Sequence, residues 1–250
     1  AVAVQRFQQH FQCRAVVVVQ PHADDLRAQV VLQRAAGGAA VVRFEVVAVA
    51  LDEGAAMVGF IFFPKSPRNV TPELAATMRK AAIGRAEAVA VTVDANDSAL
   101  DTIVTTMQPD WLQLHGHETP DRVRDVKAQY GLPVMKAFSV REAGDLNAIR
   151  PYLGIADRML FDAKAPKGSE LPGGNGVSFD WNLLAALDPG LDYMLSGGLN
   201  AGNVGEALAI TKAPGFDVSS GVESAPGIKD IGLIKEFFAA VKDARFGAKK

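Results

Sequence analysis

The chain has 250 residues, of which 49% are hydrophobic and 22% are charged, and its formal net charge at pH 7 is −2. This length suffices for one large α/β barrel, and the composition is that of a soluble globular protein. The near-neutral charge argues against a nucleic-acid partner, which would favour a basic face, and no apolar run is long enough to cross a bilayer.

Cysteine and histidine content argues against a disulfide framework and against a metal site. The only cysteine, Cys13, fits a reducing cytosol, and we therefore expect a cytoplasmic protein. Cys13 precedes an apolar run instead of following it, so no catalytic role is assigned to it. The four histidines are scattered and show no metal-ligand spacing, so no metal is expected; they are His10, His22, His115 and His117.

Residues 1 to 44 differ in composition from the rest of the chain. Glutamine is abundant there, whereas lysine, isoleucine, methionine and serine are absent. Val16 to Val19 suits a strand and Ala23 to Arg34 a short helix, but neither has cap or turn signals. We therefore predict an atypical segment over residues 1–44, disordered or misread from another reading frame, with a targeting segment as the alternative. Residues 45–245 are predicted to form the catalytic domain.

From Glu45 onward, apolar runs alternate with segments that have helical signals. Met57 to Phe62 is a continuous apolar run, typical of a strand buried on both faces of a parallel sheet. Thr71 is expected to cap a helix that begins at Pro72. The predicted strands are Met57 to Phe62, Ala88 to Val93, Trp111 to Leu114, Pro133 to Phe138, Arg158 to Phe161, Asp192 to Leu195 and Phe216 to Ser219. The predicted helices are Val46 to Leu51, Pro72 to about Ile83, Ser98 to Met107, Pro120 to Tyr130, Val140 to Ile149, Trp181 to Ala186, Asn200 to Ile210 and Ile231 to Val241.

This alternation predicts an α/β fold built from right-handed βαβ units with a parallel sheet. An eighth strand at the start is needed to close the seven predicted strands into a (β/α)8 TIM barrel, and that first strand is ill defined. A doubly wound open sheet is the alternative. We favour the barrel because no strand here is followed by the dinucleotide fingerprint of the open-sheet folds.

Two glycine-rich turns near the end of the chain point to a phosphate site. Ser196 to Leu199 follows one apolar run, and Asp217 to Glu223 follows the next strand. Loops about 20 residues apart, separated by one helix, match the site that barrel enzymes build after their seventh and eighth strands. Backbone N–H groups bind phosphate there. Ordinary strand-to-helix turns also favour glycine and serine, but a correctly spaced pair favours phosphate binding.

In a βα barrel the functional residues stand where the strands end. Asp162 directly follows a strand, where a partly desolvated carboxyl can act as a general acid; a turn cap is the alternative. Arg68 suits two-pronged binding of a carboxylate, with a solvated surface arginine as the alternative. His115 is expected to order a neighbouring group. Lys164 to Gly176 is long and glycine-rich enough for a mobile lid. The strand-end candidates are Arg68, Asp94, His115, Asp162, Ser196 to Gly198 and Asp217 to Gly221.

From about Glu45 to Ala244 the chain resembles the phosphoribosylanthranilate isomerases of tryptophan biosynthesis. The motifs occur together and in the family's order. They are Gly59 to Arg68, Leu112 to Gly116, Phe161 to Ala163, Gly173 to Gly176 before Phe179 to Trp181, Ser196 to Leu199 and Asp217 to Glu223.

The resemblance implies an Amadori rearrangement of N-(5-phosphoribosyl)anthranilate to the 1-deoxyribulose aminoketone. It implies that Asp162 protonates the ring oxygen, that Arg68 meets the anthranilate carboxylate, and that His115 lines the substrate site. It also implies that the 5-phosphate lies against Gly197, Gly198, Ser220 and Gly221. No cofactor is implied, and the partner is a small phosphorylated molecule, bound by a monomer or homodimer with no nucleic acid and no membrane.

One family feature is missing from the sequence. The family's general base is a cysteine in Lys-Ile-Cys-Gly at the end of strand one, a motif that this chain lacks. Counting back without gaps from Gly59 places that cysteine near Ala39. Alanine accepts no proton, so a phosphosugar-binding protein with impaired catalysis is the competing hypothesis. An indole-glycerol-phosphate synthase, which uses a strand lysine such as Lys136, is a third reading that the Ser-Pro-Arg and Phe-Asp-Ala signatures fit poorly.

Overall fold

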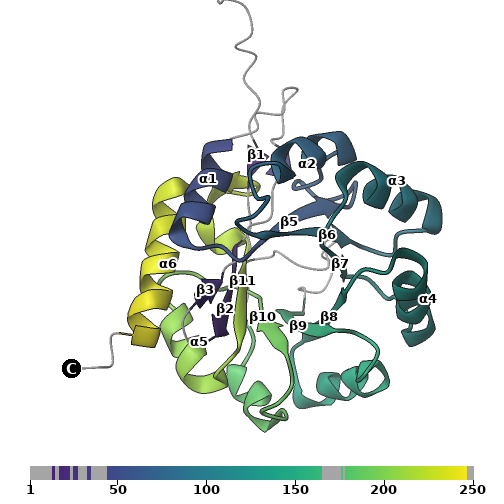
Figure 1. The fold of residues 1–250 in the computed structure, drawn as a ribbon. Coiled ribbons are helices and arrows are strands. Elements are labelled where there is room, and N and C mark those ends of the chain that lie inside the picture. Colours follow the sequence, from purple (N-terminus) through teal and green to yellow (C-terminus); the bar gives the residue numbers. More distant parts are fainter. Residues whose placement is uncertain are drawn as a thin grey trace, which may run out of the picture.

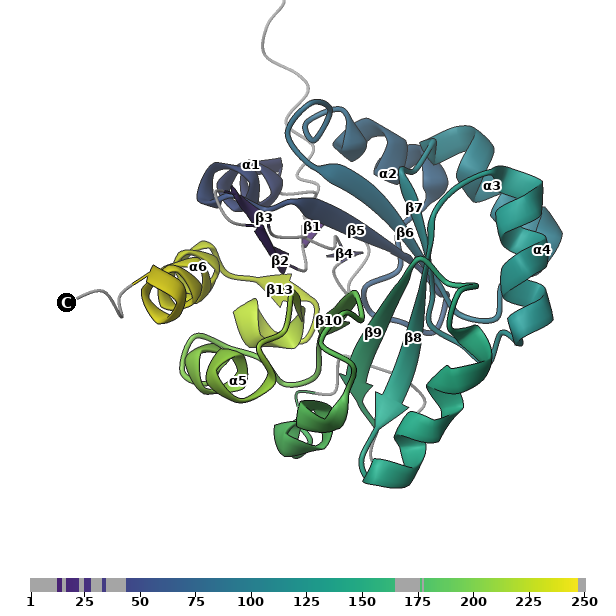
Figure 2. The same cartoon turned by 60° about the horizontal axis from the view of Figure 1, so that its bottom comes forward.

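The computed structural model describes residues 13–14, 17–22, 25–27, 33–34, 44–164, 176 and 178–246. Its centre is a curled sheet in which seven parallel strands pair in sequence order, as the apolar runs predict. In Figure 2 the arrowheads of β8 and β9 point the same way, so the carboxyl ends of the strands share one end of the barrel. The strands are β5 (Met57–Phe62), β6 (Glu87–Thr92), β7 (Trp111–Leu114), β8 (Val134–Val140), β9 (Arg158–Ala163), β10 (Tyr193–Leu195) and β11 (Gly215–Val218).

Helices surround this sheet as an outer ring (Figure 1). The side chains of Thr71, Asn96 and Thr119 accept hydrogen bonds from the first turns of α2, α3 and α4, which is why these helices begin where they do. The α-helices are α1 (Phe44–Glu53), α2 (Pro72–Arg79), α3 (Asp97–Met107), α4 (Pro120–Tyr130), α5 (Val204–Thr211) and α6 (Ile231–Phe246). The 3-10 helices are η1 (Ala143–Tyr152), η2 (Trp181–Ala186) and η3 (Ser220–Val222).

Three predicted helix boundaries were wrong for local reasons. The helix expected over Val140 to Ile149 begins only at Ala143, because β8 extends to Val140 and the Asp145 carboxylate accepts from the N–H groups of Arg141 and Glu142. The helix expected from Asn200 begins at Val204. There the Asn200 side chain accepts from Gly202 N–H, and such a bond holds a turn in place of a helix. The helix expected to reach Ile83 ends at Arg79.

The barrel is closed by a strand that runs the opposite way to the others. β2 (Val17–His22) lies between β11 and β5 and is antiparallel to both. This confirms a strand near Val16 to Val19 but corrects the expected parallel first strand. A valine-rich segment forms strands readily, and in this position it pairs the two edges that seven strands would leave open.

The helix expected over Ala23 to Arg34 is also wrong for the described residues. β3 (Asp25–Arg27) pairs antiparallel with β2, and β4 (Gln33–Arg34) pairs with β1 (Cys13–Arg14). The backbone groups of these residues therefore form hydrogen bonds between strands, not the hydrogen bonds of a helix. Pairing along the chain therefore overrides the weak local preference for helix in this segment.

Alternate residues of each parallel strand point into the barrel, and this decides which polar groups reach its mouth. The barrel interior is filled by a cluster that includes Met57, Val89, Met135, Leu160 and Met194. The residues between them pack outward against the helices in a larger cluster. Because side chains alternate with a period of two, the residue two positions after an inward residue also points inward, one layer higher.

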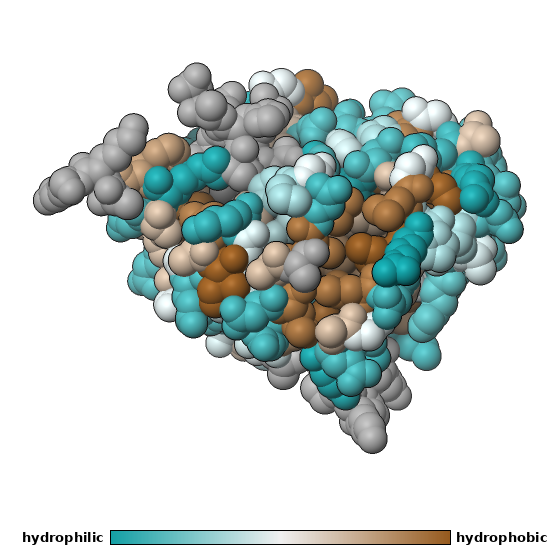
Figure 3. Space-filling view, turned by 90° about the horizontal axis from the view of Figure 1, so that it is seen from below, coloured by the Kyte–Doolittle hydropathy of each residue, from teal (hydrophilic) through white to brown (hydrophobic). Residues whose placement is uncertain are grey.

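Hydrophobic side chains are unevenly distributed over the outer surface. Figure 3 shows hydrophobic side chains gathered in a shallow hollow on the side seen from below, framed by hydrophilic residues. At the amino-terminal ends of β5 and β6, a cleft of about 710 Å³ lies between residues such as Gly54, Ala86 and Asp110. None of the described helices is long and apolar enough to cross a membrane.

Candidate active site

The sheet alternation brings four polar side chains from four strands to the mouth of the barrel. Asp162 stands two residues after the inward Leu160, and Ser196 stands two residues after the inward Met194. His115 follows β7, and Asp217 lies on β11. Asp162, Ser196 and Asp217 are buried, and His115 is largely buried. The carboxyl ends of these strands therefore form one polar cluster over an apolar interior.

Asp162 and His115 face each other inside this cluster. His115 Nε2 lies 3.3 Å from Asp162 Oδ2, within ion-pair distance but not aligned as a hydrogen bond, so Nε2 has no hydrogen-bond partner among the described residues. The Gln113 amide nitrogen lies 2.9 Å from His115 Nδ1. An amide N–H only donates, so Nδ1 accepts and the ring proton of a neutral His115 sits on Nε2, toward Asp162. Gln113 thus selects the tautomer that can support the carboxyl.

Asp217 is the most perturbed acid of the site. Its Oδ2 accepts a 2.8 Å hydrogen bond from Ser196 Oγ. The pKa of Asp217 is raised to about 7, chiefly by burial and also by the nearby Asp162, against the lowering effects of the Ser196 hydrogen bond, His115 and Lys229. A carboxyl with such a pKa changes its protonation near neutral pH, as acid–base groups in active sites do.

Arg68 is held by a buried carboxylate from the far end of the chain. Its Nε and Nη2 donate to the two oxygens of Glu223 at 3.3 Å and 3.1 Å. Arg68 is only 4% exposed, so the alternative of a solvated surface arginine does not hold. Glu223 also pairs with Lys229, whose pKa burial lowers to about 7, helped by Arg68 and opposed by Glu223.

The two glycine-rich turns touch each other. A Cβ on Gly221 would overlap the carbonyl oxygen of Leu199, which belongs to the first turn. Gly197 has φ +89°, and a Cβ there would lie 2.5 Å from the backbone nitrogen of Ala163. A Cβ on Gly176, at the end of the expected lid, would lie 3.9 Å from Ser220 Oγ. Three loops therefore meet with their backbones exposed to one another, as the approach of N–H groups to a phosphate requires.

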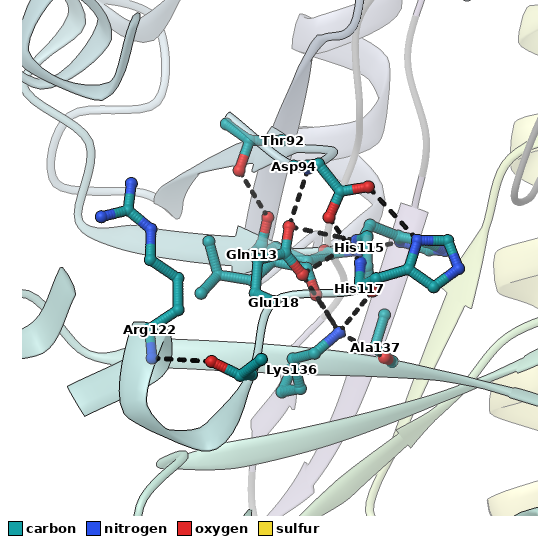
Figure 4. Close-up of polar contacts among 12 residues, drawn as sticks. Thr92, Asp94, Gln113, His115, His117, Glu118, Arg122, Lys136 and Ala137 are labelled. Atoms are coloured by element: carbon teal, nitrogen blue, oxygen red, sulfur yellow. Dashed lines mark hydrogen bonds and ion pairs between the residues drawn. The ribbon is translucent and has the colours of Figure 1, made fainter. Parts of the chain in front are cut away.

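A second buried ion pair supports the loop that carries His115 (Figure 4). Lys136 Nζ lies 3.2 Å from Glu118 Oε2 and donates to the carbonyls of Leu114 and Gly116. Glu118 in turn accepts from the N–H groups of Asp94 and Gly116. Burial lowers the pKa of Lys136, and Glu118 opposes that shift. Lys136 is thus tied into the structure under the loop, with its ammonium away from the Asp162 cluster.

The sequence located the strand-end residues but not their buried partners. Arg68, His115, Asp162 and the two turns all lie at the predicted end of the barrel, whereas Asp94 holds the loop after β7 by accepting from His117 N–H at 2.6 Å. Glu223 and Lys229 were missed, because an arginine and a glutamate 155 positions apart give no local signal. Most of the expected lid, residues 165–175, lies outside the described residues, as does Ala39.

Comparison with known proteins identifies a family for this arrangement. The family model described as N-(5'-phosphoribosyl)anthranilate (PRA) isomerase matches residues 39–240. The N-(5'-phosphoribosyl)anthranilate isomerase of Brucella canis is 72% identical over 200 residues, covering 80% of this chain and 90% of the relative.

Solved structures agree with this match. The phosphoribosyl anthranilate isomerase of Thermotoga maritima superimposes with a TM-score of 0.71 at 32% identity, covering 81% of this chain and 94% of that one. A structure of monomers generated from the dimeric Thermotoga maritima isomerase has a TM-score of 0.68 at 31% identity, with the same coverage. A third, in complex with reduced 1-(o-carboxyphenylamino)-1-deoxyribulose 5-phosphate, has a TM-score of 0.69 at 30% identity, again covering 81% and 94%.

Proposed function

The chain belongs to the N-(5'-phosphoribosyl)anthranilate isomerase family, and we propose that the polar cluster at its barrel mouth carries out the family's reaction. The reaction is an Amadori rearrangement in tryptophan biosynthesis, which converts a phosphoribosylamine into an aminoketone. The observation that carries the assignment of residues is the buried Asp162 with His115 3.3 Å away, in the same barrel mouth as two touching glycine-rich turns.

Asp162 is the general acid of the proposal. Its proton goes to the ring oxygen as the C1'–O bond breaks, and the anthranilate nitrogen lone pair forms the C1'=N bond. The proton on His115 Nε2 faces the carboxylate that this step leaves behind and stabilises it. Loss of the proton from C2' neutralises the iminium nitrogen and gives an enol. Protonation of C1', with loss of the proton from the 2'-hydroxyl group, then gives the ketone.

The remaining groups bind the two ends of the substrate. Arg68, held in plane by Glu223, is suited to the anthranilate carboxylate because a guanidinium binds carboxylates by parallel N–H donors. Gly197, Gly198, Ser220 and Gly221 form the expected 5-phosphate site, where backbone N–H groups need little added charge. His115 is placed to contact the part of the substrate next to Asp162.

A second candidate function is phosphosugar binding with impaired turnover. It is favoured by one observation: Ala39 occupies the position where the family's basic cysteine is expected, and alanine cannot take the proton from C2'. All groups assigned to binding are present in the chain. If this second function is correct, the chain binds the substrate analogue but does not turn over the substrate.

Fluorescence-monitored turnover of phosphoribosylanthranilate by the chain decides between the two. Turnover comparable to that of the Brucella canis relative supports the full reaction. Tight binding of the reduced product analogue without turnover supports the binding function. If neither turnover nor binding is found, the assignment of these residues is wrong.

We further propose a cytoplasmic protein that is a monomer or a homodimer. A single cysteine suits a reducing compartment, and one solved relative is derived from a dimeric enzyme. Light scattering of the purified chain distinguishes the two oligomeric states.

A further inference from the structure

We propose that Glu223 and Lys229 are positioning residues that fix the distance between the carboxylate-binding end and the phosphate-binding end of the active site. This inference rests on the proposed function for what the two ends bind. It concerns three charged and buried side chains, namely Arg68, Glu223 and Lys229. We call them the buried triad.

The first step is that Glu223 fixes the orientation of the Arg68 guanidinium. Its two carboxylate oxygens accept from Nε and Nη2 of Arg68, the pair of nitrogens along one edge of the guanidinium. Such a two-pronged bond fixes both the plane and the direction of the guanidinium. Glu223 therefore sets where the carboxylate-binding group points.

The second step is that the same carboxylate reaches the phosphate turn through Lys229. Lys229 pairs with Glu223 Oε1, and its Nζ also donates to the carbonyl oxygen of Ser219 at 2.6 Å. Ser219 directly precedes Ser220 and Gly221 of the expected phosphate site. One ammonium thus bonds both the group that orients Arg68 and the backbone that presents phosphate-binding N–H groups.

The third step is that this connection is buried. The side chains of Lys229, Glu223 and Arg68 are 0%, 3% and 5% exposed. Glu223 Oε2 also accepts from Gly227 N–H at 2.9 Å, inside the hairpin of β12 (Glu223–Ala225) and β13 (Ile228–Lys229). Removing one member of a buried ion pair leaves an uncompensated buried charge, so the three side chains depend on one another.

The chemical consequence concerns a ligand that carries both charged ends. Such a ligand binds with full affinity only if the two subsites already stand at the correct separation. A ligand with one charged end has no such requirement, because it can follow its own subsite. Loss of the triad should therefore weaken a two-ended ligand by more than the product of the effects on two one-ended ligands.

The test compares Glu223→Gln with Glu206→Gln, which makes the same change at an exposed residue of α5. The probes are the reduced product analogue, which has both ends, and anthranilate and ribose 5-phosphate, which have one each. Glu223→Gln is expected to weaken the analogue by about 10- to 100-fold, since hydrogen bonds to charged groups are lost. The affinity for ribose 5-phosphate is expected to fall as well, although Glu223 is not one of the four residues that we assign to phosphate binding. The control variant is expected to bind all three as the parent does.

Amide hydrogen exchange of residues 219–222 in the ligand-free protein gives a second readout that needs no ligand. Glu223→Gln and Lys229→Met are each expected to speed this exchange about tenfold, with circular dichroism reporting that both variants fold. Unchanged exchange together with a loss confined to anthranilate would overturn the proposal and reduce Glu223 to a partner of Arg68. If the parent chain binds none of the probes, the proposed function fails, but exchange still decides whether the triad holds the turn.

Discussion

Asp162 combines burial with a neighbour that can stabilise its charged form. The carboxyl is 4% exposed, and its Oδ1 accepts from the N–H of Ala163 at 2.9 Å while Oδ2 faces His115. These contacts fix one oxygen and leave the other toward the barrel mouth. The two oxygens of Asp162 therefore have different surroundings, as the proposed role of general acid requires.

Replacing Asp162 by Asn keeps the shape and removes the proton donor. We expect turnover to fall by about 10²- to 10⁴-fold while the affinity for the reduced analogue changes little. Asp125→Asn, at an exposed position on α4, serves as the matched control. Steady-state kinetics and analogue titration measure the two effects, and equal losses in turnover and binding would argue against the role of general acid.

Asp217 gives a prediction for stability against pH. Its pKa is raised from 3.8 to about 7 in the folded protein, so between these pH values the folded state holds more protons than the unfolded state. The free energy of unfolding therefore falls as pH rises from about 4 to about 7. Asp217→Asn removes this dependence and should be more stable relative to the parent at pH 8 than at pH 5.

Urea unfolding of both proteins at the two pH values measures that difference. The expected change in the gap is of the order of a few kcal/mol, because one pKa unit corresponds to about 1.4 kcal/mol. Parallel pH profiles for parent and variant would show that Asp217 is not the buried acid responsible.

At the scale of elements, the active site depends on how closely the turns after β10 and β11 pack. Gly221→Ala places a methyl group against the carbonyl of Leu199, so either turn must move. We expect a loss of about 1–3 kcal/mol in stability and weaker binding of ribose 5-phosphate. At Gly144 nothing lies within 4 Å of an added Cβ, so Gly144→Ala is the control. Thermal unfolding and phosphate titration test both variants, and equal behaviour would contradict the packing argument.

The strands and helices were largely predictable because their signals are local. Met57–Phe62 is continuous and apolar, and Thr119 followed by Pro120 marks a helix start whichever way the chain folds afterwards. Asp162 and His115 were then predicted as site residues because functional residues of βα barrels stand where the strands end. The partners of these residues were not predictable, since Glu223 and Lys229 become one unit with Arg68 only after the barrel closes. The direction of β2 was equally hidden, because a valine run pairs in either orientation.

For the molecule as a whole, the binding end and the expected base belong to different parts of the chain. The segments that follow the parallel strands supply every residue assigned to binding, whereas the base is expected near Ala39, before α1. Replacing residues 1–43 by the corresponding first strand of the Brucella canis relative should raise turnover by about 10²- to 10⁴-fold. The affinity for the reduced analogue should change far less. An unchanged rate with a correctly folded chimera would show that the missing cysteine does not limit this chain.

The reversed direction of β2 decides which of its residues lie near the mouth of the barrel. Val17 pairs with Val218 near the carboxyl end of β11, and the strand then runs away from that end toward His22. A six-residue strand spans about 20 Å, so whatever follows β2 emerges at the opposite end of the barrel. A parallel strand carries its last residue toward the mouth, whereas β2 carries its last residue away from it. β2 therefore completes the hydrogen bonding of the barrel, but it is the one of the eight described barrel strands that cannot deliver the residue after its end to the mouth.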